Sequence, residues 1–369
     1  MLAAGGSGGH LFPAFALAEE FGRRGIAVDL MTDMRGDRYG TGFPARQVYR
    51  VPAATIAGSN PLSAAKTIFT LAKGVGAARS ILADVRPGVV VGFGGYPSFP
   101  PIVAARLMGL PTALHEQNAV LGRANRMLAR RVTAIATSFE TVRLLDAATA
   151  KKAHFTGNPV RDVVLREAAK PYLPSEAGKP FYLLVFGGSQ GARFFSEVVP
   201  PALRLLPEHL QARLSVIQQA RPEDIENVRQ AYRGGGDLPT IAAEVEPFFA
   251  NLPELMAASH LVIGRAGAST VAELTVLGRP SILVPLPHAL DNDQLANATR
   301  LAESGGAVCL EQSAITPEGL AARIGGMMDN GAGLANAAAA AKAQGRPDAV
   351  ERLADLIVEL MSVKAGADA

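Results

Sequence analysis

Short apolar runs alternate with longer amphipathic stretches along most of the chain. Runs of the length and β-branched character of buried strands occur at 26–32, 89–93, 110–114, 133–136, 181–185, 215–219, 261–263 and 281–284. Stretches with the helical spacing of apolar residues include 12–24, 63–84 and 100–108. Strand–helix alternation at this spacing predicts α/β domains built on doubly wound parallel sheets.

The pattern is interrupted once, at 163–180, where three prolines and no apolar period are typical of a linker. A chain of 369 residues is long enough for two domains. We therefore expect an N-terminal domain at 1–162 and a C-terminal domain at 181–347. In the tail, 348–369, apolar residues from Val350 to Leu360 share one helical face, which predicts a helix packed back on the body.

Composition narrows the possible classes of protein. The single cysteine, Cys309, excludes a disulfide framework and a cysteine zinc site. A net charge of +3, with no basic run, gives no indication of nucleic-acid binding. The uncharged stretch 87–105 contains four prolines and cannot form a spanning helix, and no signal peptide is expected. The first strand, 1–4, is short, so either its edge is frayed or the native start lies upstream.

Two glycine-rich loops, AGGSGGH at 4–10 and FGGSQGA at 186–192, each follow a predicted strand. Both match G-x-S-x-G, so a hydrolase nucleophile at Ser189 is one interpretation, with His260 or His288 downstream. A dinucleotide site is another, because Asp33 ends the second strand, but neither loop has the G-x-G-x-x-G spacing. A phosphate cradle explains both loops, since backbone amides at a helix N-terminus bind anions.

A third loop favours the phosphate interpretation. The segment VIGRAGASTVAE, 262–273, repeats the order of strand, small-residue loop and helix. Ser269 or Thr270 can cap that helix and contact phosphate, and Glu273 can accept hydrogen bonds from a ribose diol. A nucleoside diphosphate held in this way needs no metal.

Together these motifs resemble one family. GSGGHLFPAFALA, GFGGYPSFP, HEQN, GNPVR, FGGSQGAR, RAGASTVAEL and PLPHALDNDQLANA follow one another from residue 5 to about 300, in the order of the MurG family of peptidoglycan glycosyltransferases. The resemblance implies a GT-B fold, in which two Rossmann-like domains with parallel sheets face a cleft. It also implies inverting transfer of N-acetylglucosamine from UDP-N-acetylglucosamine to the C4 hydroxyl of N-acetylmuramic acid in lipid I, giving lipid II.

The resemblance assigns roles to individual positions. The implied donor contacts are Ser7, Gly8, Gly9, Asn118, Arg161, Ser189, Phe249, Ala268, Ser269, Thr270, Val271, Ala272, Glu273 and Gln294. Tyr96 and Asn125 match acceptor-side positions. His10 is the candidate general base, and His115 with Glu116 is the rival pair.

The same resemblance implies peripheral binding at the cytoplasmic face of the membrane, and contacts with the cell-wall synthesis machinery are possible partners. Helix 63–84 carries Ile68 and Phe69 beside Lys66 and Lys73, a mixture suited to anionic lipids. No cofactor or metal is expected, although 291–293 forms a D-x-D. The strand end at 215–220 lacks the family's His and Gly, so it receives no role.

Two other functions stay open at the level of sequence. A diacylglycerol galactosyltransferase would share the donor domain and differ in the acceptor loops. A non-catalytic nucleotide-sugar-binding protein would keep the donor site alone.

Overall fold

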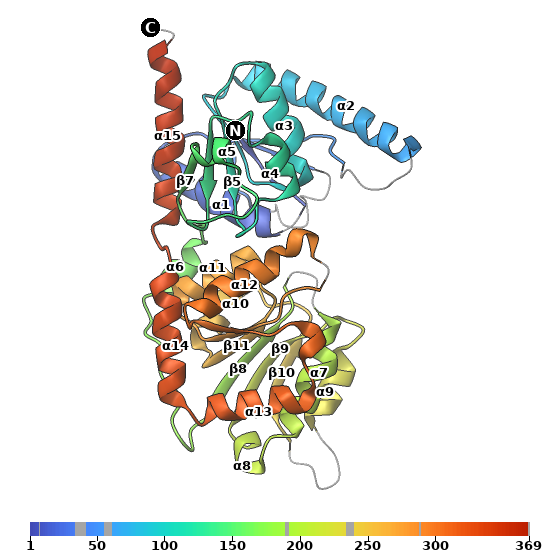
Figure 1. The fold of residues 1–369 in the computed structure, drawn as a ribbon, viewed down its shortest axis with the longest axis vertical. Coiled ribbons are helices and arrows are strands. Elements are labelled where there is room, and N and C mark those ends of the chain that lie inside the picture. The colour runs from blue at the N-terminus through green and yellow to red at the C-terminus, as the bar shows by residue number, and fades with distance from the viewer. Residues whose placement is uncertain are drawn as a thin grey trace. The chain divides into compact units, whose positions relative to one another are not determined.

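The computed structural model describes residues 1–6, 8–33, 42–54, 61–188, 192–233, 240–287 and 289–367. The chain forms two compact units (Figure 1). The first unit consists of residues 1–161 and 346–369, and the second consists of residues 162–345.

The first unit is built on a seven-stranded sheet in the order β3-β2-β1-β4-β5-β6-β7, and every strand pair in it is parallel. Its strands are β1 (Leu2–Ala3), β2 (Leu30–Thr32), β3 (Val48–Arg50), β4 (Val90–Gly92), β5 (Thr112–Glu116), β6 (Ala134–Thr137) and β7 (Ala153–Phe155). Its helices are α1 (Gly8–Arg23), α2 (Pro61–Val85), α3 (Gly95–Leu107), α4 (Arg123–Leu128), α5 (Ala147–Ala150) and α15 (Ala349–Ala367).

Both faces of this sheet are covered, because successive strand residues enter two different hydrophobic clusters. Leu30 packs with α1 and α15, whereas its neighbour Met31 packs with α2 and α3. Val91 and Val90 divide between the same two clusters. Alternation of this kind over buried strands is what a doubly wound parallel sheet requires.

The second unit has a six-stranded parallel sheet in the order β10-β9-β8-β11-β12-β13. Its strands are β8 (Phe181–Phe186), β9 (Leu214–Gln219), β10 (Ala242–Glu246), β11 (Leu261–Gly264), β12 (Ser281–Leu283) and β13 (Ala307–Cys309). Its α-helices are α6 (Asp162–Glu167), α7 (Arg193–Arg204), α8 (Glu208–Gln211), α9 (Ile225–Arg233), α10 (Leu252–Ala258), α11 (Ala268–Leu277), α12 (Asp293–Glu303), α13 (Pro317–Met328) and α14 (Gly331–Gln344). Two short 3-10 helices, η2 (Leu290–Asn292) and η3 (Gln312–Ala314), complete it.

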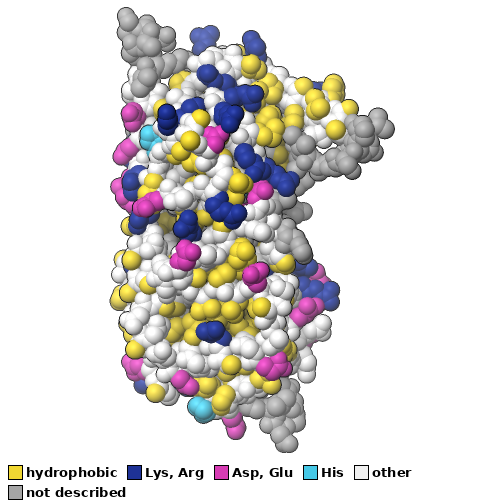
Figure 2. Space-filling model, viewed as in Figure 1, with side chains coloured by type: hydrophobic (Ala, Val, Ile, Leu, Met, Phe, Trp, Pro, Cys, Tyr) yellow, Lys and Arg dark blue, Asp and Glu magenta, His cyan; other side chains and the backbone are white. Residues whose placement is uncertain are grey.

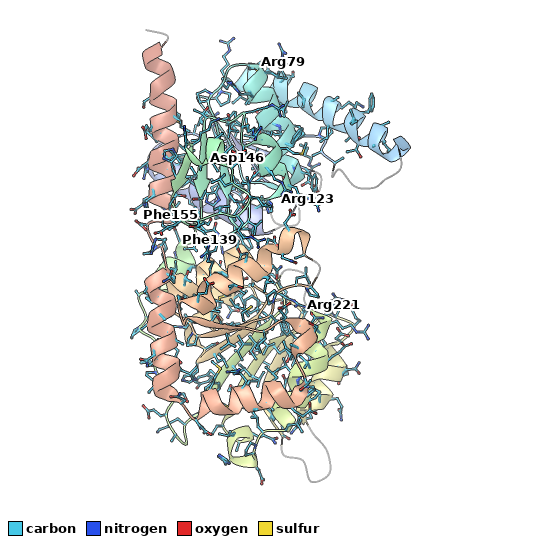
Figure 3. The ribbon with its side chains drawn as sticks, in the orientation of Figure 1. Arg79, Arg123, Phe139, Asp146, Phe155 and Arg221 are labelled. Carbon is cyan, nitrogen blue, oxygen red and sulfur yellow. The ribbon has the colours of Figure 1, made fainter. Side chains whose placement is uncertain are left out.

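The C-terminal helix α15 belongs to the first unit. Val350, Leu353 and Ile357 are buried in its core. Phe155, labelled in Figure 3, lies under two guanidinium groups, with its ring centre 5.3 Å from Arg346 and 5.6 Å from Arg352. Two cation–π contacts therefore attach the beginning of this helix to the end of β7.

The segment expected to be a linker, 163–180, lies within the second unit. It begins with most of α6. The hydroxyl group of Tyr172 donates to the carbonyl oxygen of His260 over 3.0 Å, and Arg213 donates to the carbonyl oxygen of Glu176 over 2.8 Å. These contacts hold the proline-rich stretch against the second sheet.

The predicted doubly wound parallel sheets are confirmed, with differences at element boundaries. The helix α1 begins at Gly8 instead of residue 12, and α3 begins at Gly95 instead of residue 100. The early start of α3 includes Pro97 because the first turn of a helix has no intrahelical use for the missing N–H. The short strand β1 lies in the middle of the sheet, between β2 and β4.

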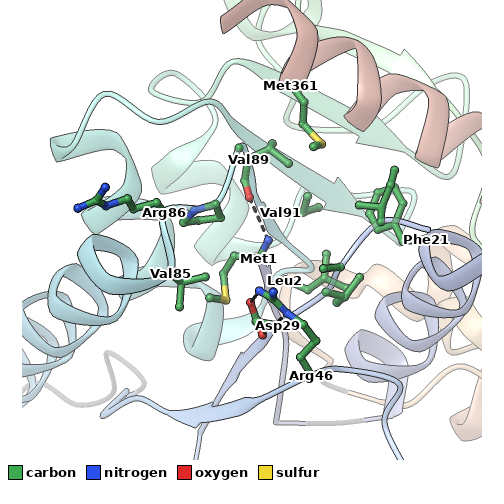
Figure 4. Close-up of a pocket in the computed structure, with 15 residues that line it drawn as sticks. Met1, Leu2, Phe21, Asp29, Arg46, Val85, Arg86, Val89, Val91 and Met361 are labelled. Carbon is green, nitrogen blue, oxygen red and sulfur yellow. Dashed lines mark hydrogen bonds and ion pairs between the residues drawn. The ribbon is translucent and has the colours of Figure 1, made fainter. Parts of the chain in front are cut away.

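A cavity of about 140 Å³ lies at the amino-terminal ends of these central strands (Figure 4). The amino group of Met1 donates to the carbonyl oxygen of Val89 over 3.1 Å, and Arg46 pairs with Asp29 over 2.5 Å. The cavity is therefore at the edge of the sheet opposite the glycine loops. No helix among the described residues is long and apolar enough to cross a membrane.

Candidate functional site

Each sheet has a switch point, which is the place between two neighbouring strands where the strand order reverses direction. In both sheets, glycine loops lie at the switch point. In the first unit the reversal falls between β1 and β4, which lead into the loop residues 4–6 and 93–94. In the second unit it falls between β8 and β11, which lead into the loop residues 187–188 and 265–267. Open parallel sheets bind ligands outside the carboxyl ends of the strands at such points.

In the first unit, His10 lies on the first turn of α1, directly after Gly8 and Gly9. Its ring packs against the turn that begins α3. A methyl group at Gly94 or Gly95 would lie 3.3 Å or 3.1 Å from Nε2 of His10. Burial lowers the pKa of His10 to about 4, so the imidazole is neutral at pH 7. Ser7, predicted to be part of this loop, lies outside the described residues.

Tyr96, on the first turn of α3, is half-buried and lies against the first glycine loop. Its hydroxyl group donates to Oδ2 of Asp33 over 2.5 Å. A methyl group at Gly6 would lie 3.5 Å from the ring. The side chain therefore connects α3 to the end of β2 across the loop that follows β1.

His115 is fully buried at the end of β5, and both of its ring nitrogens have protein partners. Nε2 of His115 lies 3.1 Å from the carbonyl oxygen of Gly157, and Nδ1 lies 2.9 Å from the side-chain amide nitrogen Nε2 of Gln117. Burial lowers the pKa of His115 to about 4. The partners assign a neutral ring with the proton on Nε2, which leaves no nitrogen to take a substrate proton.

Glu116 is also committed to the protein. Its carboxylate accepts from the backbone N–H groups of Asn118 and Gly122, over 3.0 Å and 2.8 Å. The amide of Asn125 donates to the same carboxylate over 2.8 Å and to the carbonyl oxygen of His115 over 3.2 Å. Burial raises the pKa of Glu116, and these donors oppose that effect. The sequence HEQN is thus a buried network that shapes the loop before α4.

Arg161 lies near the first loop through an aromatic contact. Its guanidinium carbon is 4.5 Å from the ring centre of Phe12 on α1. The same ring fills the space beside Gly8, where a methyl group would lie 3.0 Å from it. A cation held on an aromatic face at a glycine loop is placed to meet an anionic ligand.

In the second unit, the loop after β8 is supported by Gln219 at the end of β9. The side-chain Oε1 of Gln219 accepts from the N–H of Gly187 over 3.2 Å. Its Nε2 donates to the carbonyl oxygen of Pro247 over 3.1 Å, two residues before the buried Phe249. One side chain therefore positions two of the predicted donor segments. Ser189 itself lies outside the described residues.

The segment after β11 begins α11 with its small residues, Ala268, Ser269, Thr270, Val271 and Ala272. Oγ of Ser269 has no hydrogen-bond partner among the described residues. Glu273 follows one turn later and is 5% exposed. The hydroxyl group of Ser269 and the N–H groups of the first turn are groups of the kind that bind phosphate oxygens.

Gln294, on α12, lies beside the D-x-D motif. Its Oε1 accepts from the N–H of Leu286 over 3.0 Å, which leaves its amide Nε2 as the donor group. Asp291 and Asn292 have positive φ angles of 59° and 53°. Among the described residues, no group of three or more His, Cys, Asp or Glu side chains is arranged to hold a metal ion.

Comparison with known proteins identifies the pair of domains. The glycosyltransferase family 28 N-terminal domain matches residues 1–137, and the glycosyltransferase family 28 C-terminal domain matches residues 182–353. A relative from Allorhizobium ampelinum is 52% identical over 97% of this chain and 94% of its own length. The chain belongs to glycosyltransferase family 28.

A second relative and a solved structure also match the chain over nearly its whole length. A relative from Brucella suis is 51% identical over 99% of this chain and 94% of its own length. Both relatives are named UDP-N-acetylglucosamine--N-acetylmuramyl-(pentapeptide) pyrophosphoryl-undecaprenol N-acetylglucosamine transferase. The crystal structure of MurG from Acinetobacter baumannii has a TM-score of 0.76 at 30% identity, covering 97% of this chain and 98% of that one. The predicted resemblance and GT-B fold are confirmed.

Two supporting residues of this family 28 chain were not predicted from its sequence. Gln219 ends the strand to which no role was assigned. Arg265 donates to the carbonyl oxygens of Val284 and Pro285, both over 3.1 Å, and to Oε1 of Gln312 over 2.7 Å. A buried Arg in the glycine-containing RAGAS motif was the available signal, but its partners lie 19 to 47 residues away.

Proposed function

We propose that this family 28 glycosyltransferase moves N-acetylglucosamine from UDP-N-acetylglucosamine to the C4 hydroxyl of N-acetylmuramic acid in lipid I. Transfer with inversion at the anomeric carbon gives lipid II and UDP. The observation that carries the proposal is 52% identity, over nearly the whole length of both chains, to a transferase named for these substrates. The loops at the switch points of the two sheets supply groups suited to both substrates.

The second unit is the proposed donor domain, and its loops suit a nucleoside diphosphate. The N-terminus of α11 offers backbone N–H groups and the unpaired hydroxyl group of Ser269 to the diphosphate. Glu273 is assigned to the ribose, Phe249 and Ser189 to the uridine side, and Gln294 to the sugar hydroxyls. The same N–H groups stabilise the negative charge that develops on UDP as it leaves.

The first unit is the proposed acceptor domain, with His10 as the base. His115 and Glu116 are engaged by protein groups on all their reactive atoms, which supports a structural role for both. His10 lies at the first loop and is neutral at pH 7, so its ring can accept a proton, although a pKa of about 4 makes it a weak base for the C4 hydroxyl. His10→Ala is expected to lose turnover and keep the affinity for UDP; a large loss of UDP binding would contradict the assignment.

The remaining positions do not all follow this division. Gly8, Gly9, Asn118 and Arg161 belong to the first unit and, with Ser7, are proposed to contact the donor. Tyr96 is proposed to contact the acceptor. Asn125 supports the acceptor side through the HEQN network, because its amide bonds to His115 and Glu116.

The lipid tail of the acceptor requires a membrane surface, and α2 is the proposed contact. Ile68 and Phe69 on this helix are 67% and 65% exposed. The ammonium group of Lys73 lies 5.9 Å from the ring centre of Phe69. Figure 2 shows hydrophobic side chains gathered over α2. Exposed apolar side chains flanked by lysines suit peripheral binding to anionic lipids at the cytoplasmic face.

Vesicle flotation tests the membrane contact. Ile68→Ser with Phe69→Ser should release the protein from vesicles that contain phosphatidylglycerol. Leu173→Ser is the control, because Leu173 is 70% exposed on the second unit. Equal flotation of the double variant and the control would contradict a role for α2.

Transfer of labelled sugar tests the reaction. Wild-type protein should move radiolabelled N-acetylglucosamine from its UDP conjugate to a lipid I analogue. It should leave diacylglycerol unlabelled when UDP-galactose with radiolabelled galactose is supplied. Labelled diacylglycerol would favour the related galactosyltransferase, and UDP binding without any transfer would favour a non-catalytic binding protein.

A further inference from the structure

Two buried oxygen atoms at the end of β2 have no hydrogen-bond partner within the part of the chain that the structure describes. Thr32 and Asp33 are 4% and 5% exposed. Neither Oγ1 of Thr32 nor Oδ1 of Asp33 has a hydrogen-bond partner among the described residues. Buried polar atoms are rarely left unpaired, because each one loses its hydrogen bonds to water on folding. A carboxylate oxygen with no partner among the described residues is able to accept a hydrogen bond from a donor that arrives with a ligand.

Both atoms point toward the first glycine loop. A methyl group at Gly5 would lie 2.8 Å from Oγ1 of Thr32 and 2.8 Å from Oδ1 of Asp33. Only a residue without a side chain leaves room for this approach. The two oxygen atoms thus lie at the carboxyl ends of the strands, beside the loop at the switch point of the first sheet.

The second carboxylate oxygen of Asp33 already has its partner. Oδ2 accepts from the hydroxyl group of Tyr96 over 2.5 Å. That hydrogen bond orients the carboxylate and leaves Oδ1 as the buried oxygen with no partner among the described residues. Asp33 is therefore held in place by α3 and the loop, as a preorganised acceptor should be.

The chemistry of Asp33 limits what it can bind. A carboxylate repels phosphate oxygens, so it does not contact a diphosphate directly. Its natural partners are neutral donors, the hydroxyl groups and amide N–H of a sugar. In a loop that binds a glycosyl diphosphate, such a donor lies on the sugar next to the diphosphate.

We propose that Asp33 is an acceptor-binding residue whose Oδ1 accepts a hydrogen bond from a hydroxyl group or the amide N–H of the acceptor's amino sugar. Thr32 lines the same position, and Tyr96 positions the carboxylate. This inference rests on the proposed function, because it takes the acceptor to be the N-acetylmuramyl lipid.

Two-substrate kinetics on Asp33→Asn test the proposal. The variant should raise KM for the lipid I analogue by about tenfold or more and change KM for UDP-N-acetylglucosamine by less than about twofold. Asp29→Asn is the matched control. Asp29 lies just before β2, at its other end, is 4% exposed, and also has one side-chain partner, Arg46. It should change thermal stability without changing either KM.

The outcomes separate this proposal from the proposed function. Wild-type protein that transfers sugar to lipid I, with Asp33→Asn unchanged in acceptor KM, would overturn the assignment of Asp33 alone. Equal effects on both substrates, or effects equal to those of Asp29→Asn, would also overturn it. Wild-type protein inactive with lipid I would overturn the proposed function and this assignment together.

Tyr96→Phe distinguishes direct binding from support. If Oδ1 of Asp33 contacts the acceptor, removing the Tyr96 hydroxyl group should raise the acceptor KM less than Asp33→Asn does. If Asp33 serves only to hold Tyr96, the two variants and their double variant would show the same loss. That result would overturn the proposed contact.

Discussion

At the scale of single residues, the first loop depends on how closely His10 approaches the backbone of α3. Gly94 and Gly95 have positive φ angles of 82° and 66°, and the imidazole occupies the space where their side chains would lie. Glycine is required there for two reasons, backbone conformation and contact. The two reasons can be separated by experiment, because Gly109, just after α3, has the positive φ angle but no close neighbour.

Gly95→Ala should remove most of the transferase activity, because the new methyl group would displace His10. Gly109→Ala is the control. Gly109 has a φ angle of 69°, and nothing lies within 4 Å of the position of its added methyl group. Both variants should lose about 1–2 kcal/mol of unfolding free energy from the left-handed conformation. Equal activity in the two variants would show that the position of His10 is unimportant.

The pKa of His115 predicts an acid-sensitive fold. The unfolded ring takes up a proton below pH 6.5, whereas the folded ring does so only near pH 4. The unfolded state therefore gains protons first, and the unfolding free energy should fall by about 3 kcal/mol for this group as the pH drops from 6.5 to 4. Above pH 6.5 its contribution is constant.

Denaturant unfolding of His115→Asn at several pH values checks this expectation. The variant should be less stable than wild type at pH 7.5 and should lose less stability between pH 6.5 and pH 4.5. His154→Asn, on the exposed side of β7, should follow the wild-type curve. A His115→Asn curve parallel to wild type would contradict the buried, neutral ring.

At the scale of elements, the donor loops are held by side chains from neighbouring strands. Gln219 of β9 joins the loop after β8 to the turn before Phe249. Arg265 after β11 joins β12 to the 3-10 helix η3. Loops at the carboxyl ends of parallel strands need such supports, because their own hydrogen bonds are few.

Gln219→Leu should raise KM for UDP-N-acetylglucosamine about tenfold, because both donor loops lose a hydrogen bond to a fixed side chain. Gln211→Leu is the matched control. Gln211 is similarly buried, at 8% against 7% exposed, and its amide also bonds to two backbone groups, the carbonyl oxygens of Arg204 and Leu206. Both variants should lose similar stability. A donor KM raised equally in both would contradict the specific role of Gln219.

These elements also show what sequence can predict. The glycine loops and buried strands were predictable because their signals are local: a few glycines directly after an apolar run. The start of α3 was placed at residue 100 instead of Gly95, because the glycine and the proline of its first turn give no helical signal in the sequence, although a first turn tolerates proline. The supports at Gln219 and Arg265 join residues 19 to 47 positions apart, which no local pattern reveals.

The candidate site was predictable to a similar extent. The HEQN motif singled out His115 and Glu116 as a possible base and its orienter, but one sequence could not show that both side chains point into a buried network. Asp33 was considered only as a ribose-binding acid of a dehydrogenase. Its contact with Tyr96, 63 residues away, depends on β2 and β4 lying on either side of β1.

At the scale of the whole molecule, the two substrates are proposed to bind mainly to different members of a pair of similar domains. Each sheet offers a glycine loop and a second loop at its switch point. The first unit adds an imidazole, a phenol and a carboxylate, which suit a sugar hydroxyl nucleophile. The second adds a helix N-terminus, an unpaired hydroxyl group and a buried acid, which suit a nucleoside diphosphate. Acceptor and donor binding should therefore respond to different substitutions.

Initial-rate kinetics with both substrates varied test this division most directly, on wild type, Tyr96→Phe and Glu273→Gln. We predict that Tyr96→Phe raises KM for the lipid I analogue alone and that Glu273→Gln raises KM for UDP-N-acetylglucosamine alone. A rise in the donor KM with Tyr96→Phe, or in the acceptor KM with Glu273→Gln, would contradict the assignment of acceptor and donor to the two domains.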